Sequence, residues 1–229
     1  MSNLIELSNL NKNFVSLKRI HVLKKINYKF KKGKIYSLMG PSGSGKSTLL
    51  NLLSLIDRPS SGSITIEKDQ IDFNNSTKND ILRAKKIGII YQQDNLLPDF
   101  TALENIYLAS LAAGKDKEFS MLRAKTLLRK VGLTSRSNHY PSQLSGGEKQ
   151  RVAIARAFAT EPAVLFADEP TGNLDSRTGA KIMELMFEIN HNLSTTLVLV
   201  THDQNLAKRC DRTISLDVGK LVSDQRHNG

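Results

Sequence analysis

Residues 35–55 read IYSLMGPSGSGKSTLLNLLSL and decide the fold class. The apolar run Ile35–Met39 predicts a buried strand, and the run 48–55 predicts a helix. Between them lies Gly40-Pro41-Ser42-Gly43-Ser44-Gly45-Lys46-Ser47, which matches the phosphate-binding pattern G-x-x-x-x-G-K-[ST] in the required strand–loop–helix context. Glycines let backbone N–H groups turn toward phosphate oxygens, and a helix beginning near Lys46 favours an anion. The alternative is a Gly/Ser-rich linker that matches the pattern by chance. A chance match in a chain of this size occurs only about once in a hundred.

A phosphate loop of this type has specific roles for its last residues. Lys46 is expected to reach the β- and γ-phosphates of a nucleotide, and the Ser47 hydroxyl to bind Mg²⁺. The apolar run 163–167 predicts a second strand, which ends in Asp168 and Glu169. Since ligands of open α/β sheets bind at the carboxyl ends of strands, we expect Asp168 to hold Mg²⁺ through its water shell and Glu169 to polarise the attacking water. Without a phosphate loop, this acidic pair would be interpreted as a solvated strand end.

The rest of the chain alternates between strand and helix patterns. Antiparallel strands are predicted at 4–10, 20–30 and Ser63–Glu67. Buried parallel strands are predicted from short apolar runs, which short helices would also fit, at 35–39, 87–90, 163–167 and 196–200. Helices are predicted at the capping box Thr101-Ala102-Leu103-Glu104, over 122–131 with Gly132 as C-cap, and over 148–159 and 178–190. The pattern indicates an α/β sheet with an all-helical stretch inserted at about 95–160.

Composition sets further limits. The 229 residues contain 33 Lys and Arg against 22 Asp and Glu, a formal charge of +11. The single cysteine, Cys210, excludes a disulfide scaffold and a multi-cysteine metal site. No apolar run approaches the ~18–20 residues of a membrane helix, and the N-terminus lacks the basic and long apolar regions of a signal peptide. We therefore expect the chain to stay where it is made.

The positive charge is concentrated near the N-terminus. Between Glu6 and Asp57 there is no acidic residue and there are ten cations: Lys12, Lys18, Arg19, Lys24, Lys25, Lys29, Lys31, Lys32, Lys34 and Lys46. One hypothesis is an electropositive field for a polyanion, such as nucleic acid, a membrane surface or a phosphorylated ligand. The other, which we favour for all but Lys46, is that these are solvated lysines on a strand edge.

A third motif, Leu144-Ser145-Gly146-Gly147-Glu148, predicts a turn followed by a helix start. It lies 168 − 145 = 23 residues before Asp168. Ser-Gly-Gly at a helix start forms a second anion site. One chain does not need two γ-phosphate sites, but two chains arranged head-to-tail do, because each can cap the other's nucleotide.

These motifs, in this order and over essentially the whole chain, resemble the ATP-binding subunits of ABC transporters. The resemblance implies an ABC ATPase fold: an α/β, P-loop NTPase (RecA-like) core with an antiparallel β subdomain, at about 1–92 and 161–229, and an inserted helical subdomain at about 93–160. It implies ATP and Mg²⁺ as ligands and hydrolysis of ATP coupled to transport. The implied partners are a second copy of the chain and integral membrane permease subunits, with the chain peripheral on the cytoplasmic side of the bacterial inner membrane.

The resemblance also assigns residues. It makes Gly40–Thr48 the Walker A loop, Leu144–Glu148 the signature, and Val164–Asp168 Walker B, with Glu169 as catalytic carboxylate. Many members have glutamine where this chain has Glu148. Lys46, Glu169 and His202 are the implied catalytic residues, and Ser47, Gln92 and Asp168 the implied Mg²⁺ ligands.

Three of these assignments have alternatives. Gln92 is chosen over the adjacent Gln93 because it follows Tyr91. His202 is implied to be the switch histidine at the γ-phosphate, although alone it would be interpreted as a structural hydrogen-bonding residue. Phe14 lies where the family usually has a tyrosine stacked on adenine, and could equally be a core residue. Asp175, in the implied D-loop Asn173-Leu174-Asp175, would cross the dimer interface.

Two segments narrow the resemblance. Leu96–Ile106 and Asp168–Asp175 resemble the lipoprotein-releasing ATPases (LolD), whose close relatives serve macrolide exporters and FtsE-type cell-division complexes. This implies a LolC/LolE-like permease pair and release of lipoproteins from the inner membrane toward the outer membrane. The macrolide-exporter and FtsE-type functions stay open. A nucleic-acid-associated ABC ATPase is disfavoured, because such proteins usually carry paired ATPase domains, coiled coils or zinc-binding cysteines. A non-hydrolysing scaffold is disfavoured because Lys46, Asp168, Glu169 and His202 are all present.

Overall fold

The computed structural model describes residues 2–15 and 19–227 and contains two compact units. The first unit comprises Met1–Asp80 and Thr196–Gly229, and the second comprises Ile81–Thr195. The predicted division into an α/β core with a β subdomain, at about 1–92 and 161–229, and a helical subdomain, at about 93–160, stays a prediction. Helix α2 (Ser76–Lys86) leads from the first unit into the second.

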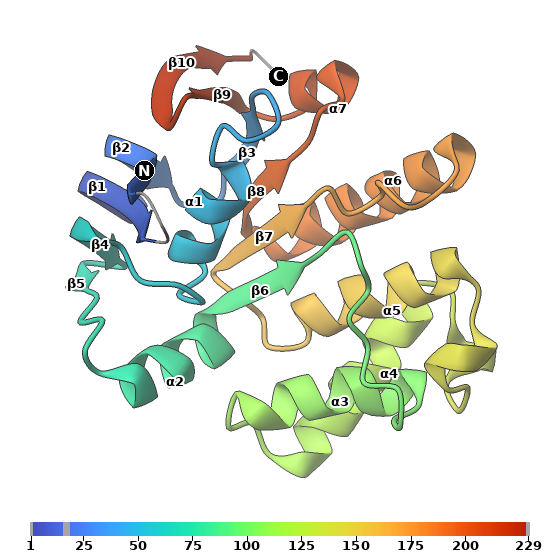
Figure 1. Cartoon of the computed structure of the whole chain (residues 1–229). Helices are drawn as coiled ribbons and strands as arrows, with labels where there is room; N and C mark the ends of the chain where they lie inside the picture. The colour runs from blue at the N-terminus through green and yellow to red at the C-terminus, as the bar shows by residue number, and fades with distance from the viewer. Residues whose placement is uncertain (1, 16–18, 228–229) are drawn as a thin grey trace. The chain divides into compact units, whose positions relative to one another are not determined.

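The first unit contains the antiparallel sheet (Figure 1). Its strand order is β2-β1-β4-β5, with bounds β1 Asn3–Val15, β2 Arg19–Lys31, β4 Ser61–Ile66 and β5 Asp69–Gln70. This confirms the three predicted antiparallel strands. β1 and β2 are longer than predicted, because register shifts on either side of Leu10 let the pairing continue beyond it. The inward-facing side chains Ile5, Leu7, Leu10 and Phe30 are buried.

The same unit contains a parallel group of strands. β3 (Ile35–Met39) lies between β8 (Thr196–Val200) and β9 (Arg212–Asp217), parallel to both, and β10 (Lys220–Arg226) pairs antiparallel with β9. All of β8 is buried, as expected for strands covered on both faces. Two helices follow strands of this group, α1 (Lys46–Leu53) after β3 and the short α7 (Gln204–Lys208) after β8.

The second unit contains a parallel strand pair and most of the helices. β6 (Ile87–Ile90) pairs with β7 (Val164–Asp168), which confirms both predicted strands. The helices are α3 (Ala102–Ala112), α4 (Lys117–Lys130), α5 (Gly146–Phe158) and α6 (Ser176–Leu193), with 3₁₀ turns at Thr134–Arg136 and Pro141–Gln143. α3, α4 and α5 pack against one another (Figure 1). The predicted all-helical stretch is therefore confirmed.

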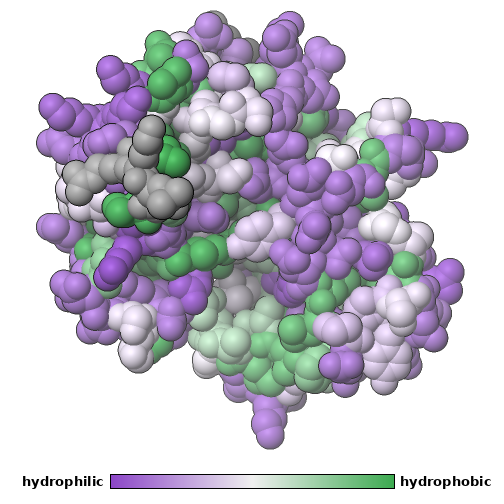
Figure 2. Space-filling view, viewed as in Figure 1, coloured by the Kyte–Doolittle hydropathy of each residue, from purple (hydrophilic) through white to green (hydrophobic). Residues whose placement is uncertain are grey.

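Helix ends in this unit follow the predicted local chemistry. Thr101 caps α3 in a capping box with Glu104, as its sequence predicts. α4 ends at Lys130 with Val131 as its C-cap, so the prediction of Gly132 as C-cap is wrong by one residue. Gly132 follows the cap, and its φ of 68° lies in the left-handed region that favours glycine. α3 is rich in alanine and leucine, and apolar side chains gather over it at the surface (Figure 2). Among the residues that the structure describes, no helix combines the length and apolar character needed to cross a membrane.

Candidate nucleotide-binding site

The phosphate loop joins β3 to α1, and α1 begins at Lys46, as predicted. Its N-cap is Gly45, with a φ of 104° and no side-chain hydrogen bond to the helix start. The first N–H groups of α1 are therefore not used by a capping side chain. At the other end of the loop, a Cβ on Gly40 would lie 2.0 Å from the carbonyl oxygen of Leu216. The loop thus passes so close to β9 that only glycine fits there.

The side chains of the loop fit phosphate. Lys46 is only 7 % exposed, and its Nζ donates hydrogen bonds to the carbonyl oxygens of Gly40 (2.8 Å) and Pro41 (2.9 Å). The Oγ of Ser44 is buried and has no hydrogen-bond partner within residues 2–15 and 19–227. A buried ammonium and an unsatisfied buried hydroxyl both gain from an oxyanion, since an unpaired buried polar group is costly.

His202 follows β8 in the same unit. Leu38 of β3 is paired with Val200 of β8, and the N–H of Thr201 donates to the carbonyl oxygen of Leu38 (3.4 Å). The carboxyl ends of these two strands are therefore adjacent, and both the phosphate loop and exposed His202 leave from that edge. Its predicted contact with the γ-phosphate stays a prediction.

Phe14, on β1, is 45 % exposed. The alternative that Phe14 is a core residue is therefore wrong. The Nζ of Lys12 lies 4.8 Å from the centroid of its ring, a cation–π contact. Stacking of Phe14 on adenine stays a prediction.

The expectation that the N-terminal lysines are solvated is wrong for Lys12. Its side chain is buried and pairs with Asp57, Nζ to Oδ2 2.7 Å, because an ammonium is stable in the interior only with a partner. Two further lysines of the group pair with acidic side chains, Lys29 with Glu6 (3.1 Å) and Lys34 with Asp211 (2.6 Å). Lys18 lies outside the described residues. Part of the concentrated charge is thus balanced by acidic residues from elsewhere in the unit.

The predicted carboxylates lie at one strand edge of the second unit. Ile90 of β6 is paired with Ala167 of β7, so Gln92 after β6 and Asp168 at the end of β7 leave from the same edge. Glu169 has a φ of 44°, a left-handed backbone that costs a non-glycine residue roughly 1–2 kcal/mol. Such backbone strain persists only where the surrounding structure holds it, and it can accompany a functional position.

Gln92 contacts the D-loop. Its Nε2 donates to Oδ1 of Asn173 (3.0 Å), and Nδ2 of Asn173 donates back to the carbonyl oxygen of Gln92 (3.2 Å). Because Gln92 makes both of these hydrogen bonds, the structure favours Gln92 over Gln93 as the functional glutamine. Asn173 was included in the predicted D-loop, but no sequence signal connects it with Gln92.

The signature begins α5. Ser145 is the N-cap and forms a capping box with Glu148, while Leu144 is buried. A hydrogen bond from the N–H of Ser145 (2.8 Å) lowers the pKa of the Glu148 carboxyl, and Arg136 contributes an ion pair at 3.1 Å. Glu148 therefore holds the signature turn as a carboxylate, and Gly146 and Gly147 occupy the first two helical positions, whose N–H groups lack intrahelical partners.

The signature and the D-loop lie against each other within the second unit. Asp175 is the N-cap of α6, and its Oδ1 accepts from the N–H of Thr178 (3.0 Å). Hydrogen bonds from the side chain and backbone of Thr178 lower the pKa of Asp175. A Cβ on Gly147 would lie 2.9 Å from Cγ2 of Thr178, so the starts of α5 and α6 are in close contact. This contact carries no sequence signal.

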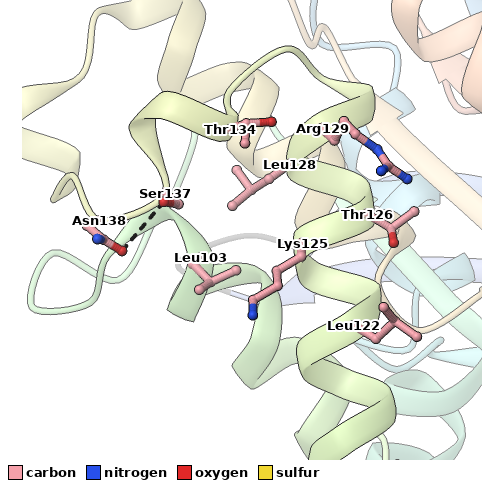
Figure 3. Close-up of a pocket in the computed structure, with 9 residues that line it drawn as sticks. All are labelled: Leu103, Leu122, Lys125, Thr126, Leu128, Arg129, Thr134, Ser137 and Asn138. Atoms are coloured by element: carbon pink, nitrogen blue, oxygen red, sulfur yellow. Dashed lines mark hydrogen bonds between the residues drawn. The ribbon is translucent and has the colours of Figure 1, made fainter.

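The proposed metal ligands suit Mg²⁺ chemically. The hydroxyl of Ser47, the carboxylate of Asp168 and the amide oxygen of Gln92 are each hard-oxygen donors of the kind that Mg²⁺ prefers, and their joint binding of the ion stays a prediction. A different pocket, of about 430 Å³, lies beside α4, and none of the predicted site residues lines it (Figure 3).

The sequence and the fold agree with those of known proteins. The family model described as "ABC transporter" matches residues 23–172, more than half of the chain. This chain belongs to the ABC transporter family. The predicted ABC ATPase fold and the prediction of an ATP-binding, ATP-hydrolysing subunit are thereby confirmed.

Three similar ABC proteins are informative. The lipoprotein-releasing system ATP-binding protein LolD of Legionella pneumophila (strain Paris) is 48 % identical over 205 residues, 90 % of each chain. LolD of Aquifex aeolicus is 42 % identical over 224 residues, 98 % of each chain. The ATP-binding cassette MJ0796, solved as a dimer in a post-hydrolysis state bound to ADP and Pi, has a TM-score of 0.89 at 40 % identity, covering 98 % of this chain and 99 % of that one.

Proposed function

We propose that two copies of this chain bind two ATP molecules between them and drive membrane permease subunits that release lipoproteins. The observation that carries the proposal is that one chain has two helix starts suited to anions, α1 after the phosphate loop and α5 at Ser145. A head-to-tail pair uses both, because the phosphate loop of one copy and the signature of the other act on the same nucleotide. The dimeric form of MJ0796, which is bound to ADP and Pi, supports the formation of a dimer.

Each predicted residue has a role in this proposal. Lys46 and the backbone N–H groups of the loop Gly40–Ser47 bind the phosphates, and Ser145 and Gly147 of the second copy contact the γ-phosphate. Mg²⁺, which Ser47, Asp168 and Gln92 would hold, neutralises phosphate charge. Glu169 polarises the attacking water, and His202 contacts the γ-phosphate. Asp175 contacts the second copy of the chain, and Phe14 stacks on adenine.

The dimer is tested by size-exclusion chromatography with ATP. Glu169→Gln removes the carboxylate that polarises water but keeps the phosphate contacts, so this variant is expected to elute as an ATP-bound dimer and to hydrolyse ATP about 10²–10⁴-fold more slowly. Lys46→Ala is expected to stay monomeric. Asn74→Ala, an exposed turn residue, is the matched control. A Glu169→Gln chain that stays monomeric with ATP would contradict the proposal.

The transport function rests on the names of the similar proteins. Two LolD proteins at 42 % and 48 % identity support a role in lipoprotein release, with this subunit peripheral on the cytoplasmic side of the bacterial inner membrane. Affinity isolation from membranes is expected to recover two different permeases, a LolC/LolE-like pair with large periplasmic domains. Recovery of one self-paired permease would support a macrolide-type exporter, and FtsE-type partners would support the cell-division function. Salt-sensitive retention on DNA, with no permease, would instead support the nucleic-acid alternative.

A further inference from the structure

The backbone around Gln92 is held from both sides by α5. Nε2 of Gln150 donates to the carbonyl oxygen of Tyr91 (3.2 Å). The guanidinium of Arg156 donates to the carbonyl oxygens of Asp94 (Nη2, 2.8 Å) and Asn95 (Nη1, 2.6 Å). One carbonyl group before Gln92 and two after it are thus hydrogen-bonded to the same helix. The backbone on both sides of Gln92 is therefore held in place, and the part of Gln92 that can still move is its side chain.

Asn173 removes that remaining freedom. Its Oδ1 accepts from the Gln92 side-chain Nε2, and its Nδ2 donates to the Gln92 main-chain oxygen, so one amide holds both parts of Gln92. The Gln92 side chain also lies close to the backbone of Gly172, the residue before the D-loop, because a Cβ on Gly172 would be 2.8 Å from Nε2 of Gln92. Gln92 and Asn173 are both exposed, so this arrangement is not a consequence of core packing.

The hydrogen bond decides which end of the amide is available. A glutamine amide has one oxygen and one NH₂ group, and only the oxygen can bind a cation. With Nε2 committed to Oδ1 of Asn173, the other end of the amide, Oε1, is the one that is presented. We propose that Asn173 is a positioning residue that orients the Gln92 amide with its oxygen toward Mg²⁺. The inference rests on the proposed function, in which Gln92 is a metal ligand.

Outer-shell partners of this kind typically change metal affinity by 10–100-fold. Asn173→Ala is therefore expected to raise the Mg²⁺ concentration for half-maximal ATP hydrolysis about tenfold, while the ATP concentration dependence at saturating Mg²⁺ changes less than about twofold. Asn173→Asp keeps an oxygen acceptor for Nε2 and is expected to recover most of the Mg²⁺ affinity. Asn74→Ala is the matched control for loss of an exposed asparagine.

A second readout needs neither metal nor nucleotide. In the nucleotide-free chain, the Gln92 side-chain amide resonance, identified by its loss in Gln92→Glu, is expected to move toward the position of a solvated amide in Asn173→Ala. It should stay nearer its original position in Asn173→Asp. An unchanged resonance in Asn173→Ala would show that the contact is not formed in solution.

The double variant Asn173→Ala/Gln92→Ala separates positioning from general damage. Asn173→Ala should add no further change in Mg²⁺ dependence when Gln92 is already alanine. The inference is overturned if the same shift occurs in the Gln92→Ala background, or if Asn173→Ala leaves Mg²⁺ dependence unchanged. Lys46→Ala separates failure of the proposed function from failure of this inference. If Lys46→Ala still hydrolyses ATP at the unsubstituted rate, the proposed function fails. If Lys46→Ala is inactive but Asn173→Ala leaves the Mg²⁺ dependence unchanged, only the role of Asn173 is overturned.

Discussion

Gly147 of the signature and Thr178 of α6 approach so closely that a Cβ on Gly147 would lie 2.9 Å from Cγ2 of Thr178. Thr178 lies in the first turn of α6, and its β-branched side chain has few rotamers with which to avoid the added carbon. A glycine is therefore needed at this position for packing within the second unit, in addition to any role of its N–H group toward phosphate.

This contact predicts that Gly147→Ala lowers the free energy of unfolding by about 1–3 kcal/mol, the usual cost of overpacking. Thr178→Ser removes Cγ2 alone, so the double variant should regain most of the lost stability. Gly146→Ala is the control, because its Cβ would lie at an ordinary 3.5 Å from Leu174. Denaturant unfolding without nucleotide compares the unsubstituted chain with Gly147→Ala, Thr178→Ser, the double variant and Gly146→Ala. Equal losses at Gly146 and Gly147 would contradict the packing argument.

The Lys12–Asp57 pair predicts a second stability effect. Lys12 is 7 % exposed, and its Nζ also donates to the carbonyl oxygen of Arg58 (2.9 Å). Removing one partner of a buried pair leaves an uncompensated charge, so Asp57→Asn is expected to lower the free energy of unfolding by about 3 kcal/mol. With Lys12→Met already in place, Asp57→Asn should cost much less. Urea denaturation of the two single variants and the double variant gives this difference.

An exposed ion pair provides the comparison. Lys29 and Glu6 lie 3.1 Å apart with most of the lysine side chain in solvent. Lys29→Met is expected to change the free energy of unfolding by less than about 1 kcal/mol. If the Lys12 and Lys29 variants lost the same stability, burial would not explain the effect.

The sequence predicted those parts of the fold that local patterns encode. β3, β6 and β8 have the predicted bounds because each is a short apolar run between turn residues. α2 was not predicted, because its sequence, STKNDILRAKK, has few apolar residues to define a helical face. The short α7 and the strands β9 and β10 were not predicted either. β9 alternates only weakly, and its buried positions, such as Thr213, become evident only beside β3.

In the candidate site too, features encoded by consecutive residues were predicted, and contacts between distant residues were not. Walker A and the signature were predictable because their chemistry lies within a few consecutive residues. The contacts of Asn173 with Gln92 join residues 81 positions apart, and that of Gly147 with Thr178 joins two helix starts. Such contacts depend on how elements pack, which no local pattern specifies. The burial of Lys12 was missed for this reason too, since its partner Asp57 is 45 residues away.

Glu104 predicts a specific pH dependence. Hydrogen bonds from the backbone N–H and the hydroxyl of Thr101 lower the pKa of this carboxyl below its ordinary value of 4.5. Because the folded-state pKa is the lower one, the contribution of the carboxylate is fully present above the unfolded-state pKa. It is lost as pH falls through the folded-state pKa.

The measurement compares the native chain with Glu104→Gln, which can still accept from the Thr101 N–H but carries no charge. The native chain should be more stable at neutral pH, and the difference should shrink as pH is lowered below about 4.5. Thermal unfolding from pH 7 to pH 3 gives this difference. A difference that stayed constant over the whole range would mean that the charge of Glu104 does not contribute.

The burial of Cys210 predicts that its thiol is unreactive in the folded chain. It is buried, its Sγ lies 3.5 Å from the carbonyl oxygen of Leu206, and burial raises its pKa to about 12. At neutral pH almost none of it is thiolate, the reactive form, so a thiol reagent should modify the native chain only as fast as the site opens. In denaturant, the same reagent should react with one thiol per chain within the mixing time. Rapid modification of the native chain would show that the segment around α7 opens readily, whereas slow modification would make the chain suitable for dimer tests with introduced surface cysteines.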